Sequence, residues 1–217
     1  MNRLPQAKRV HVVKALVEGN SVRATVRTAG VAKNSVTKLL LDLGQACSEY
    51  QDQALRGLTC RRVQCDEIWA FCYAKAATVP EDHKGQFGDG DIWTWMALDA
   101  DSKLVPTWLV GDRSTADATV FIQDLADRIV TRIQLTTDGH RPYLGAVEGA
   151  FGSEIDCAML IKLYGADPSA ERRYSPPECI GAQPRRIQGT PTPGTSPPPT
   201  WSGRTSRCRW ECGGPPG

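Results

Sequence analysis

The sequence predicts an α/β protein: a mixed β-sheet flanked by helices, with an all-α domain before it and a disordered tail after it. Apolar residues recur with a helical period in the first 59 residues and in strand-like runs from about residue 63. From there the expected order is three strands, a helix, a strand, a helix and a strand, which is typical of a mixed sheet. The predicted domains are therefore 1–59, 60–188 and 189–217.

Residues 1–59 are predicted to form a helix-turn-helix domain. Ser21 is expected to cap a second helix over residues 22–29, Gly30 to supply the turn, and Asn34 to cap a third helix. The apolar face of the first helix is expected at Val10, Val13, Leu16 and Val17.

The polar face of the third helix suits DNA. Lys33, Ser35, Thr37 and Lys38 are the side chains expected to meet phosphates and base edges in a major groove. Residues 1–62 hold 11 Lys and Arg against 4 Asp and Glu, whereas residues 63–181 hold 10 against 19. The basic N-terminal domain beside an acidic second domain predicts that the N-terminal domain binds double-stranded DNA. A structural three-helix domain without DNA binding is the alternative.

The second predicted domain, residues 60–188, is expected to contain both strands and helices. Pro106 removes a backbone donor, so the third strand is expected at an edge or a bulge. Ser114 and Asp117 predict a capped helix between the third and fourth strands. The tryptophans at positions 69, 93, 95 and 108 are expected in the core, with a base-stacking platform as the less favoured alternative. Strands are predicted over 63–73, 92–98, 104–110, 133–137 and 158–164, and a second helix over 143–151.

Two aspartates stand out on these strands. Asp66 lies inside the apolar first strand, and Asp138 closes the fourth, directly before a glycine. A charge in such a strand needs a partner, a metal or a solvated cleft. If the two strands are neighbours, the aspartates meet at one edge of the sheet and offer the hard oxygen ligands that Mg²⁺ prefers. A solvated strand end for Asp66 and a turn-forming role for Asp138 are the alternatives.

The segments that contain these aspartates resemble a known family. Residues Gln64–Trp69 and Thr136–His140 are similar to the catalytic core of bacterial insertion-sequence transposases of the group of insertion element one, and Gly90–Trp95 and Gly111–Arg113 add to the likeness. The resemblance covers about residues 8–188. It implies a ribonuclease H-like fold and an Asp-Asp-Glu triad that holds Mg²⁺ (or Mn²⁺).

The resemblance also assigns roles. Asp66 and Asp138 would be the first two acids and metal ligands of an enzyme that nicks and rejoins DNA at the ends of the element. Such an enzyme is expected to act as a homo-oligomer on DNA. His140 follows the second acid and is expected to contact a phosphate or the substrate strand.

The third acid departs from the family pattern. The family places it in a helix reading Tyr-Val-Glu-Arg-Gln-Asn, where this chain reads Trp201-Ser202-Gly203-Arg204. Codons that encode this stretch can spell the family helix when read one nucleotide earlier. We therefore expect the tail after about Gly189, with 7 Pro and 6 Gly in 29 residues, to be translated out of frame. A mutation, a programmed frameshift and a sequencing error all remain open as its origin. Glu148, Glu154 and Glu178 are poor replacements for the missing acid.

The sequence thus predicts an insertion-sequence transposase in a partial or inactive form, with weak or absent strand transfer. The alternatives are a non-catalytic DNA-binding repressor of transposition and a ribonuclease H-like nuclease unrelated to transposition.

The chain has no 18-residue apolar run, which argues against a membrane span. Its N-terminus lacks the apolar core of a signal peptide, so a cytoplasmic location is expected.

Overall fold

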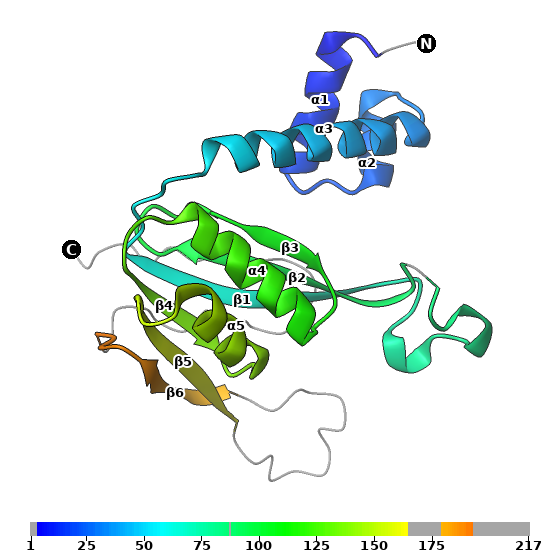
Figure 1. Cartoon of the computed structure of the whole chain (residues 1–217). Helices are drawn as coiled ribbons and strands as arrows, with labels where there is room; N and C mark the ends of the chain where they lie inside the picture. Colours follow the sequence, from blue (N-terminus) through cyan, green and yellow to red (C-terminus); the bar gives the residue numbers. More distant parts are fainter. Residues whose placement is uncertain (1–3, 87, 165–178, 193–217) are drawn as a thin grey trace. The chain divides into compact units, whose positions relative to one another are not determined.

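The computed structural model describes residues 4–86, 88–164 and 179–192 (Figure 1). Contacts divide the chain into two compact units, Met1–Gly57 and Leu58–Gly217. None of the helices in the described part is long and apolar enough to cross a membrane.

The first unit contains helices α1 (Gln6–Val17), α2 (Val22–Ala29) and α3 (Lys33–Ala54). The Ser21 hydroxyl accepts a hydrogen bond from the Ala24 amide, so the predicted cap of α2 is confirmed. Gly30 adopts the left-handed conformation predicted for the turn, with φ of 61°. The prediction for Asn34 is wrong, because α3 begins at Lys33 and Ala32 stands at its cap position, two residues before Asn34.

The core of this helical unit is small. Val12, Val31 and Val36 are buried, and partly buried apolar side chains from all three helices pack around them. The predicted apolar face of α1 was partly wrong: Val10 and Val17 are exposed, and Val12 supplies the buried contact instead. A rotation of the helix about its axis by a fraction of a turn accounts for the difference, since period alone does not fix which stripe faces inward.

The second unit is a six-stranded mixed sheet in the order β3-β2-β1-β4-β5-β6. Strands β1, β4 and β5 are parallel, and every other neighbouring pair is antiparallel. This central parallel trio beside an antiparallel β1–β2–β3 meander is the ribonuclease H-like arrangement that the sequence predicts. The strands are β1 (Arg62–Cys72), β2 (Gly90–Asp99), β3 (Trp108–Gly111), β4 (Ile133–Asp138), β5 (Ile155–Tyr164) and β6 (Cys179–Gln188).

Helices α4 (Thr115–Arg128) and α5 (Pro142–Phe151) pack together against one face of the sheet (Figure 1). Phe121, Ile122 and Leu125 of α4 are fully buried there with Leu135 of β4. Burial of such side chains from water is the main stabilising contribution to this unit. The Ser114 hydroxyl accepts from the Asp117 amide at 3.1 Å, which confirms the predicted cap of α4.

Three details of the sheet differ from the prediction. The third strand begins at Trp108, since Pro106 cannot donate to a ladder, although β3 is the edge strand as expected. The fifth strand begins at Ile155, three residues early. Strand β6 was not predicted, because Pro184 and two arginines mask its pattern; it pairs with β5 as an antiparallel edge strand.

The predicted disorder of the tail from residue 189 fails over its first four residues. Gly189 follows β6, and the Thr190 amide donates to Asp156 Oδ1 at 2.7 Å. Thr192 exchanges two hydrogen bonds with the side chain of Gln134. Residues 189–192 are thus tied to β4 and β5, while the rest of the predicted tail lies outside the described residues.

Candidate active site at the carboxyl ends of the central strands

The topology brings Asp66 and Asp138 to the same edge of the sheet. Strand β1 pairs in parallel with β4, and Cys65 aligned with Thr137 is the last paired position. Each aspartate follows that position by one residue. Because neighbouring strands lie about 4.8 Å apart and side chains alternate between faces, the two carboxylates are close neighbours on one face. The juxtaposition expected from the sequence is therefore present.

Backbone groups hold both carboxylates. Asp66 Oδ1 accepts from the Glu67 amide at 3.0 Å, and Asp138 Oδ1 accepts from the His140 amide at 2.9 Å. The second bond closes the turn in which Gly139 follows the strand. The side chain of Asp138 is 18% exposed, so the carboxylate is partly buried at the carboxyl end of β4.

A third carboxylate, Glu67, lies beside this pair and was not among the predicted site residues. Its side chain is only 1% exposed, and its Oε2 accepts from Arg113 Nε at 3.2 Å and Nη2 at 3.0 Å. The same guanidinium reaches Asp138 Oδ2 at 3.4 Å. Arg113 thus links a buried acid to the second strand-end aspartate. The adjacent acids Asp66 and Glu67 were the signal available in the sequence, but the contact with Arg113 spans 46 residues.

The loop that presents Arg113 is held from two sides. The indole of the buried Trp95 donates to the Asp112 carbonyl at 3.0 Å, and the Asp112 amide donates to Asp117 Oδ2 at 2.8 Å. Arg113 itself lies over the ring of Trp93, 4.8 Å from its centroid. These contacts restrict where the guanidinium can go, and they explain how Gly111–Arg113 belongs to the site.

Buried polar groups gather at this end of the sheet. The Tyr143 hydroxyl shares a hydrogen bond with the Glu67 carboxyl, and His140 Nε2 is buried without a hydrogen-bond partner in the described residues. Burial raises the pKa of the Glu67 carboxyl, and the charge of Asp138 adds to the rise, while the hydrogen bond from Tyr143 and the charge of Arg113 oppose it. Burial also raises the pKa of the Tyr143 hydroxyl far above its ordinary value. Buried ionisable groups with shifted pKa values are typical of functional sites.

His140 lies differently from the position expected for a DNA contact. Its ring packs 5.6 Å from Trp95 and 6.0 Å from Tyr143, measured between ring centroids. Burial, together with the charge of Arg113, lowers the pKa of His140. The His140 ring therefore packs against the aromatic side chains beneath the site, and the His140 backbone amide donates to Asp138.

The two carboxylates are suitable ligands for a divalent cation, but they do not by themselves form a full set of protein ligands. Asp66 and Asp138 offer hard oxygen atoms on neighbouring strand ends, which is the donor type that Mg²⁺ or Mn²⁺ requires. Within residues 4–86, 88–164 and 179–192, no group of three His, Cys, Asp or Glu side chains is placed to hold a metal ion. Glu148 is exposed on α5, and Glu154 lies 3.8 Å from Arg132; Glu178 falls outside the described residues.

The predicted DNA-contacting residues of the helical unit lie on the first turns of α3. Lys33 is exposed, and Ser35 and Thr37 are half-buried. The Thr37 hydroxyl donates back to the carbonyls of Lys33 and Asn34, and Lys38 forms an exposed ion pair with Asp42 at 3.1 Å. Lys33 is therefore the residue of the set that is best placed for a phosphate.

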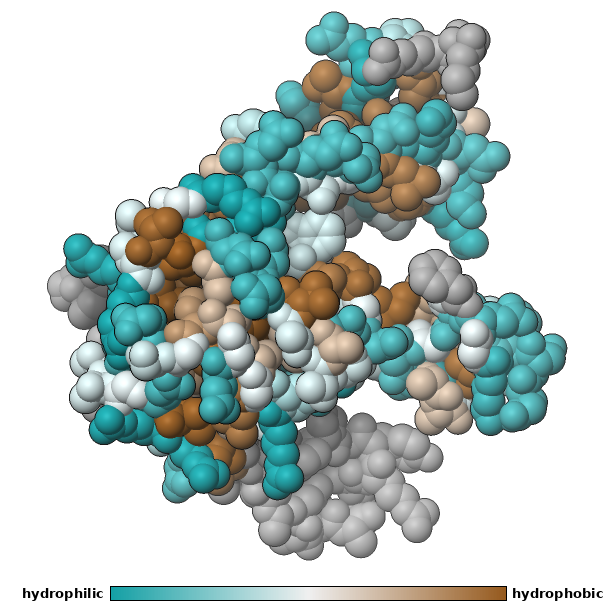
Figure 2. All heavy atoms as spheres, in the orientation of Figure 1, coloured by the Kyte–Doolittle hydropathy of each residue, from teal (hydrophilic) through white to brown (hydrophobic). Residues whose placement is uncertain are grey.

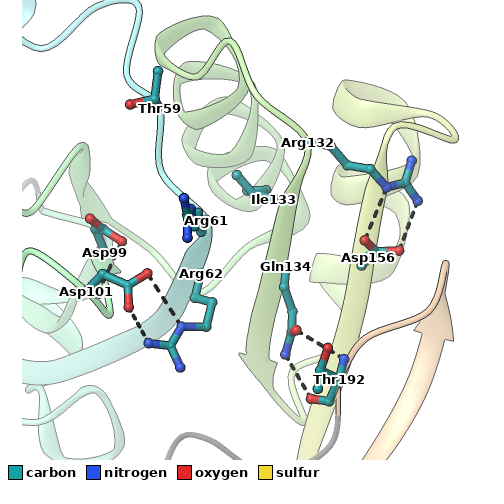
Figure 3. Close-up of a pocket in the computed structure, with 10 residues that line it drawn as sticks. All are labelled: Thr59, Arg61, Arg62, Asp99, Asp101, Arg132, Ile133, Gln134, Asp156 and Thr192. Carbon is teal, nitrogen blue, oxygen red and sulfur yellow. Dashed lines mark hydrogen bonds and ion pairs between the residues drawn. The ribbon is translucent and has the colours of Figure 1, made fainter.

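A hollow at the other end of the parallel strands of the sheet unit differs in character (Figure 3). It has a volume of about 630 Å³. Arg62 pairs with Asp101, Arg132 pairs with Asp156, and Gln134 binds Thr192 (Figure 3). Its charges are matched, and ligand sites of open α/β sheets lie at the carboxyl ends of the strands. We therefore place the functional site at Asp66 and Asp138.

A comparison with family models and with curated proteins gives no match. Among solved structures, the chain is similar to piggyBac transposase in its synaptic complex with hairpin DNA, at a TM-score of 0.34 and 11% identity. The similarity covers 76% of this chain and 31% of that one. The chain therefore spans less than a third of the length of that transposase. Because so distant a likeness decides neither fold nor reaction, the fold class rests on the strand order.

Proposed function

We propose that the chain is a DNA-processing protein built like an insertion-sequence transposase of the group of insertion element one. The observation that supports this most is the parallel pairing of β1 and β4, which sets Asp66 beside Asp138 at the strand ends. In this proposal the helical unit binds double-stranded DNA, and the sheet unit holds the phosphodiester to be cut.

Each residue of the site has a distinct part in the proposed chemistry. Asp66 and Asp138 would hold Mg²⁺ (or Mn²⁺), which when bound activates an oxygen nucleophile and stabilises the leaving oxygen. Arg113, with a side chain 38% exposed, presents positive charge beside the pair and attracts a phosphate oxygen. Glu67 fixes Arg113 from the buried side, and the His140 amide orients Asp138.

Metal binding tests this site directly. Mn²⁺ titrated into the protein and followed by electron paramagnetic resonance should bind, and Asp66→Asn or Asp138→Asn should weaken binding by about tenfold or more, as loss of a carboxylate ligand does. Asp156→Asn is the matched control, since it removes an aspartate of β5 at the opposite end of the sheet. Equal binding by all four proteins would refute the proposed site.

We further propose that the chain by itself transfers strands weakly or not at all. The resemblance implies three acids, and in the described part of the chain no third acid joins Asp66 and Asp138 in a group placed to hold a metal ion, which supports this part of the proposal. Incubation with Mg²⁺ and DNA containing the ends of the element is expected to give no joined product. Efficient joining that disappears in Asp66→Ala would show that the two acids suffice and would contradict this part of the proposal.

A DNA-binding repressor is the second candidate, and the separate compactness of the helical unit favours it. Under both candidates Asp66→Ala leaves DNA binding intact, but only an enzyme loses cleavage. Lys33→Ala should weaken binding to duplex DNA and reduce the salt dependence by about one phosphate contact. Lys14→Ala, in the last turn of α1, is the control and should change neither quantity. Sedimentation of the DNA complex would show whether the protein binds as a homo-oligomer.

A further inference from the structure

The long β1–β2 hairpin exposes aromatic side chains close to the acid pair. The strands run out beyond α4 into an arm (Figure 1), and hydrophobic residues reach the surface where the arm leaves the sheet (Figure 2). Trp69 and Phe71, two residues apart on β1, are 38% and 47% exposed. The expectation that Trp69 belongs to the core is therefore wrong; of the four strand tryptophans, Trp95 is the one that is fully buried.

These rings form a continuous surface. The centroids of Trp69 and Phe71 lie 5.7 Å apart, and Trp93 of β2 is directly opposite Trp69 in the strand register. Side chains at paired positions of neighbouring strands share a face, so the three rings lie together. We call Trp69, Phe71 and Trp93 the aromatic platform.

Two cations lie over rings of the platform. Lys75 Nζ lies 5.3 Å from the Trp69 centroid, and the Arg113 guanidinium lies 4.8 Å from that of Trp93. Two acidic side chains of the arm have local partners: Asp91 accepts from the Ala76 amide, and Asp89 pairs with His83 at 2.8 Å. Exposed rings combined with accessible cations are complementary to a polyanion whose subunits have flat faces, and a purely apolar partner would not need the cations.

The platform is continuous with the candidate active site. Arg113 contacts both Trp93 and Asp138, and it also binds Glu67, which precedes Trp69 by two residues on the same face of β1. Asp66 lies on the opposite face of β1, so the platform meets the candidate site through Arg113 and Asp138. A nucleic-acid strand held at Arg113 and Asp138 would therefore pass the platform.

We propose that the aromatic platform binds unpaired bases of a DNA strand, whose phosphates meet Lys75 and Arg113. This inference rests on the proposed function and names the form of DNA that the site accepts. Stacking on aromatic rings is available only to bases that have left the duplex, because paired bases present their edges and not their faces. The site would thus favour ends that are frayed or single-stranded over intact duplex.

Fluorescence anisotropy with a labelled oligothymidylate and with a labelled duplex of equal length tests the proposal. Loss of one stacking ring reduces affinity by about five- to 100-fold. Trp69→Ala and Phe71→Ala should therefore weaken binding of the oligothymidylate by that factor and change duplex affinity by less than about twofold. Trp69→Phe should retain most of the affinity. The control is Trp108→Ala, which removes a 45% exposed tryptophan from the edge strand β3 and should change neither affinity.

Circular dichroism verifies that each variant is folded. Unchanged oligothymidylate binding in Trp69→Ala and Phe71→Ala, or an equal loss in Trp108→Ala, would overturn the platform. The two proposals can fail separately. If oligothymidylate binding depends on Trp69 while Mn²⁺ binding is independent of Asp66, the platform stands and the catalytic proposal fails; the reverse result rejects the platform alone.

Discussion

The two ends of the parallel strands in the sheet unit contrast in how their polar groups are satisfied. At the amino ends, Arg62 and Arg132 each pair with an aspartate at the solvent-facing rim. At the carboxyl ends, one guanidinium pairs with both Glu67 and Asp138, and His140 Nε2 is buried without a hydrogen-bond partner in the described residues. A protein selected only for stability would satisfy both ends alike. The difference indicates that the carboxyl ends are shaped for a ligand with charge of its own.

The largest expected effect concerns Trp95, which supports the carboxyl end from within the core. Trp95→Ala removes a fully buried ring that packs against Phe121 and Tyr143, and it frees the Asp112 carbonyl. The free energy of unfolding of the sheet unit should fall by about 3–5 kcal/mol, because the cavity adds to the lost burial. Urea unfolding followed by circular dichroism measures the loss.

Trp108→Ala is the matched control, since its ring is 45% exposed on the edge strand. We expect a change of less than about 1 kcal/mol there. Similar losses in both variants would mean that the core is not organised around Trp95.

The next effect isolates the shared guanidinium. Arg113→Ala leaves the Glu67 carboxylate buried without its ion pair, and breaking a buried pair costs about 3–5 kcal/mol. Because Arg113 is 38% exposed, we expect a smaller loss of about 1–3 kcal/mol, in line with the desolvation of one unsatisfied group. Tryptophan fluorescence reports this unit specifically, as all six tryptophans follow residue 57.

A second substitution sharpens this result. In the double variant Arg113→Ala/Glu67→Gln the buried charge is gone, so the protein should be more stable than Arg113→Ala alone. A double variant that is less stable than the single one would show that Glu67 does not depend on Arg113 for its charge.

These residues also show which parts of the site can be predicted from the sequence. Asp66 and Asp138 could be singled out from local signals, a charge inside an apolar strand and a terminal Asp-Gly turn, but their pairing was conditional on neighbouring strands, and the structure supplies that condition as the parallel pairing of β1 with β4. Glu67 was not, since its burial depends on Tyr143 and Arg113, which arrive from distant segments. A core position was favoured over a base-stacking role for Trp69 for a related reason: a tryptophan on a strand is normally buried, and the 38% exposure of Trp69 depends on which segments cover β1.

The same limit explains the errors in the fold. Strand β6 depends on pairing with β5 rather than on its own pattern, which Pro184 and Arg185 interrupt. The caps at Ser21 and Ser114 were right because a cap is decided within three residues.

A third prediction tests the anchoring of residues 189–192 at the amino end. Gly189 has φ of 65°, and a Cβ atom there would lie 2.7 Å from the Ile155 carbonyl oxygen and 2.9 Å from the Asp156 Cα. Gly189→Ala should therefore displace this segment and lower the free energy of unfolding by about 1–3 kcal/mol through backbone strain. Urea unfolding followed by tryptophan fluorescence measures it.

Gly145→Ala provides the control in the same unit. Gly145 lies in α5 with nothing within 4 Å of an added Cβ, so this variant should gain about 0.5–1 kcal/mol of helix stability. If Gly189→Ala is as stable as the parent, residues 190–192 do not depend on the conformation of Gly189.

The smallest effect belongs to the satisfied pair at the amino end, where Asp156 meets Arg132. The hydrogen bond from Arg132, assisted by the Thr190 amide, lowers the pKa of Asp156. A lowered pKa in the folded state means that the pair stabilises the protein at neutral pH and that this contribution is lost as the pH falls below the ordinary aspartate pKa of about 3.9 and through the lower folded-state pKa. Asp156→Asn should accordingly be slightly less stable than the parent at pH 7 and equal to it in acid.

Glu154→Gln, which alters a more exposed neighbour of Arg132, should show almost no difference in stability from the parent at either pH. A loss in Asp156→Asn as large as that in Arg113→Ala would remove the contrast between the two ends, because it would show that exposed and buried pairs of this sheet carry equal weight.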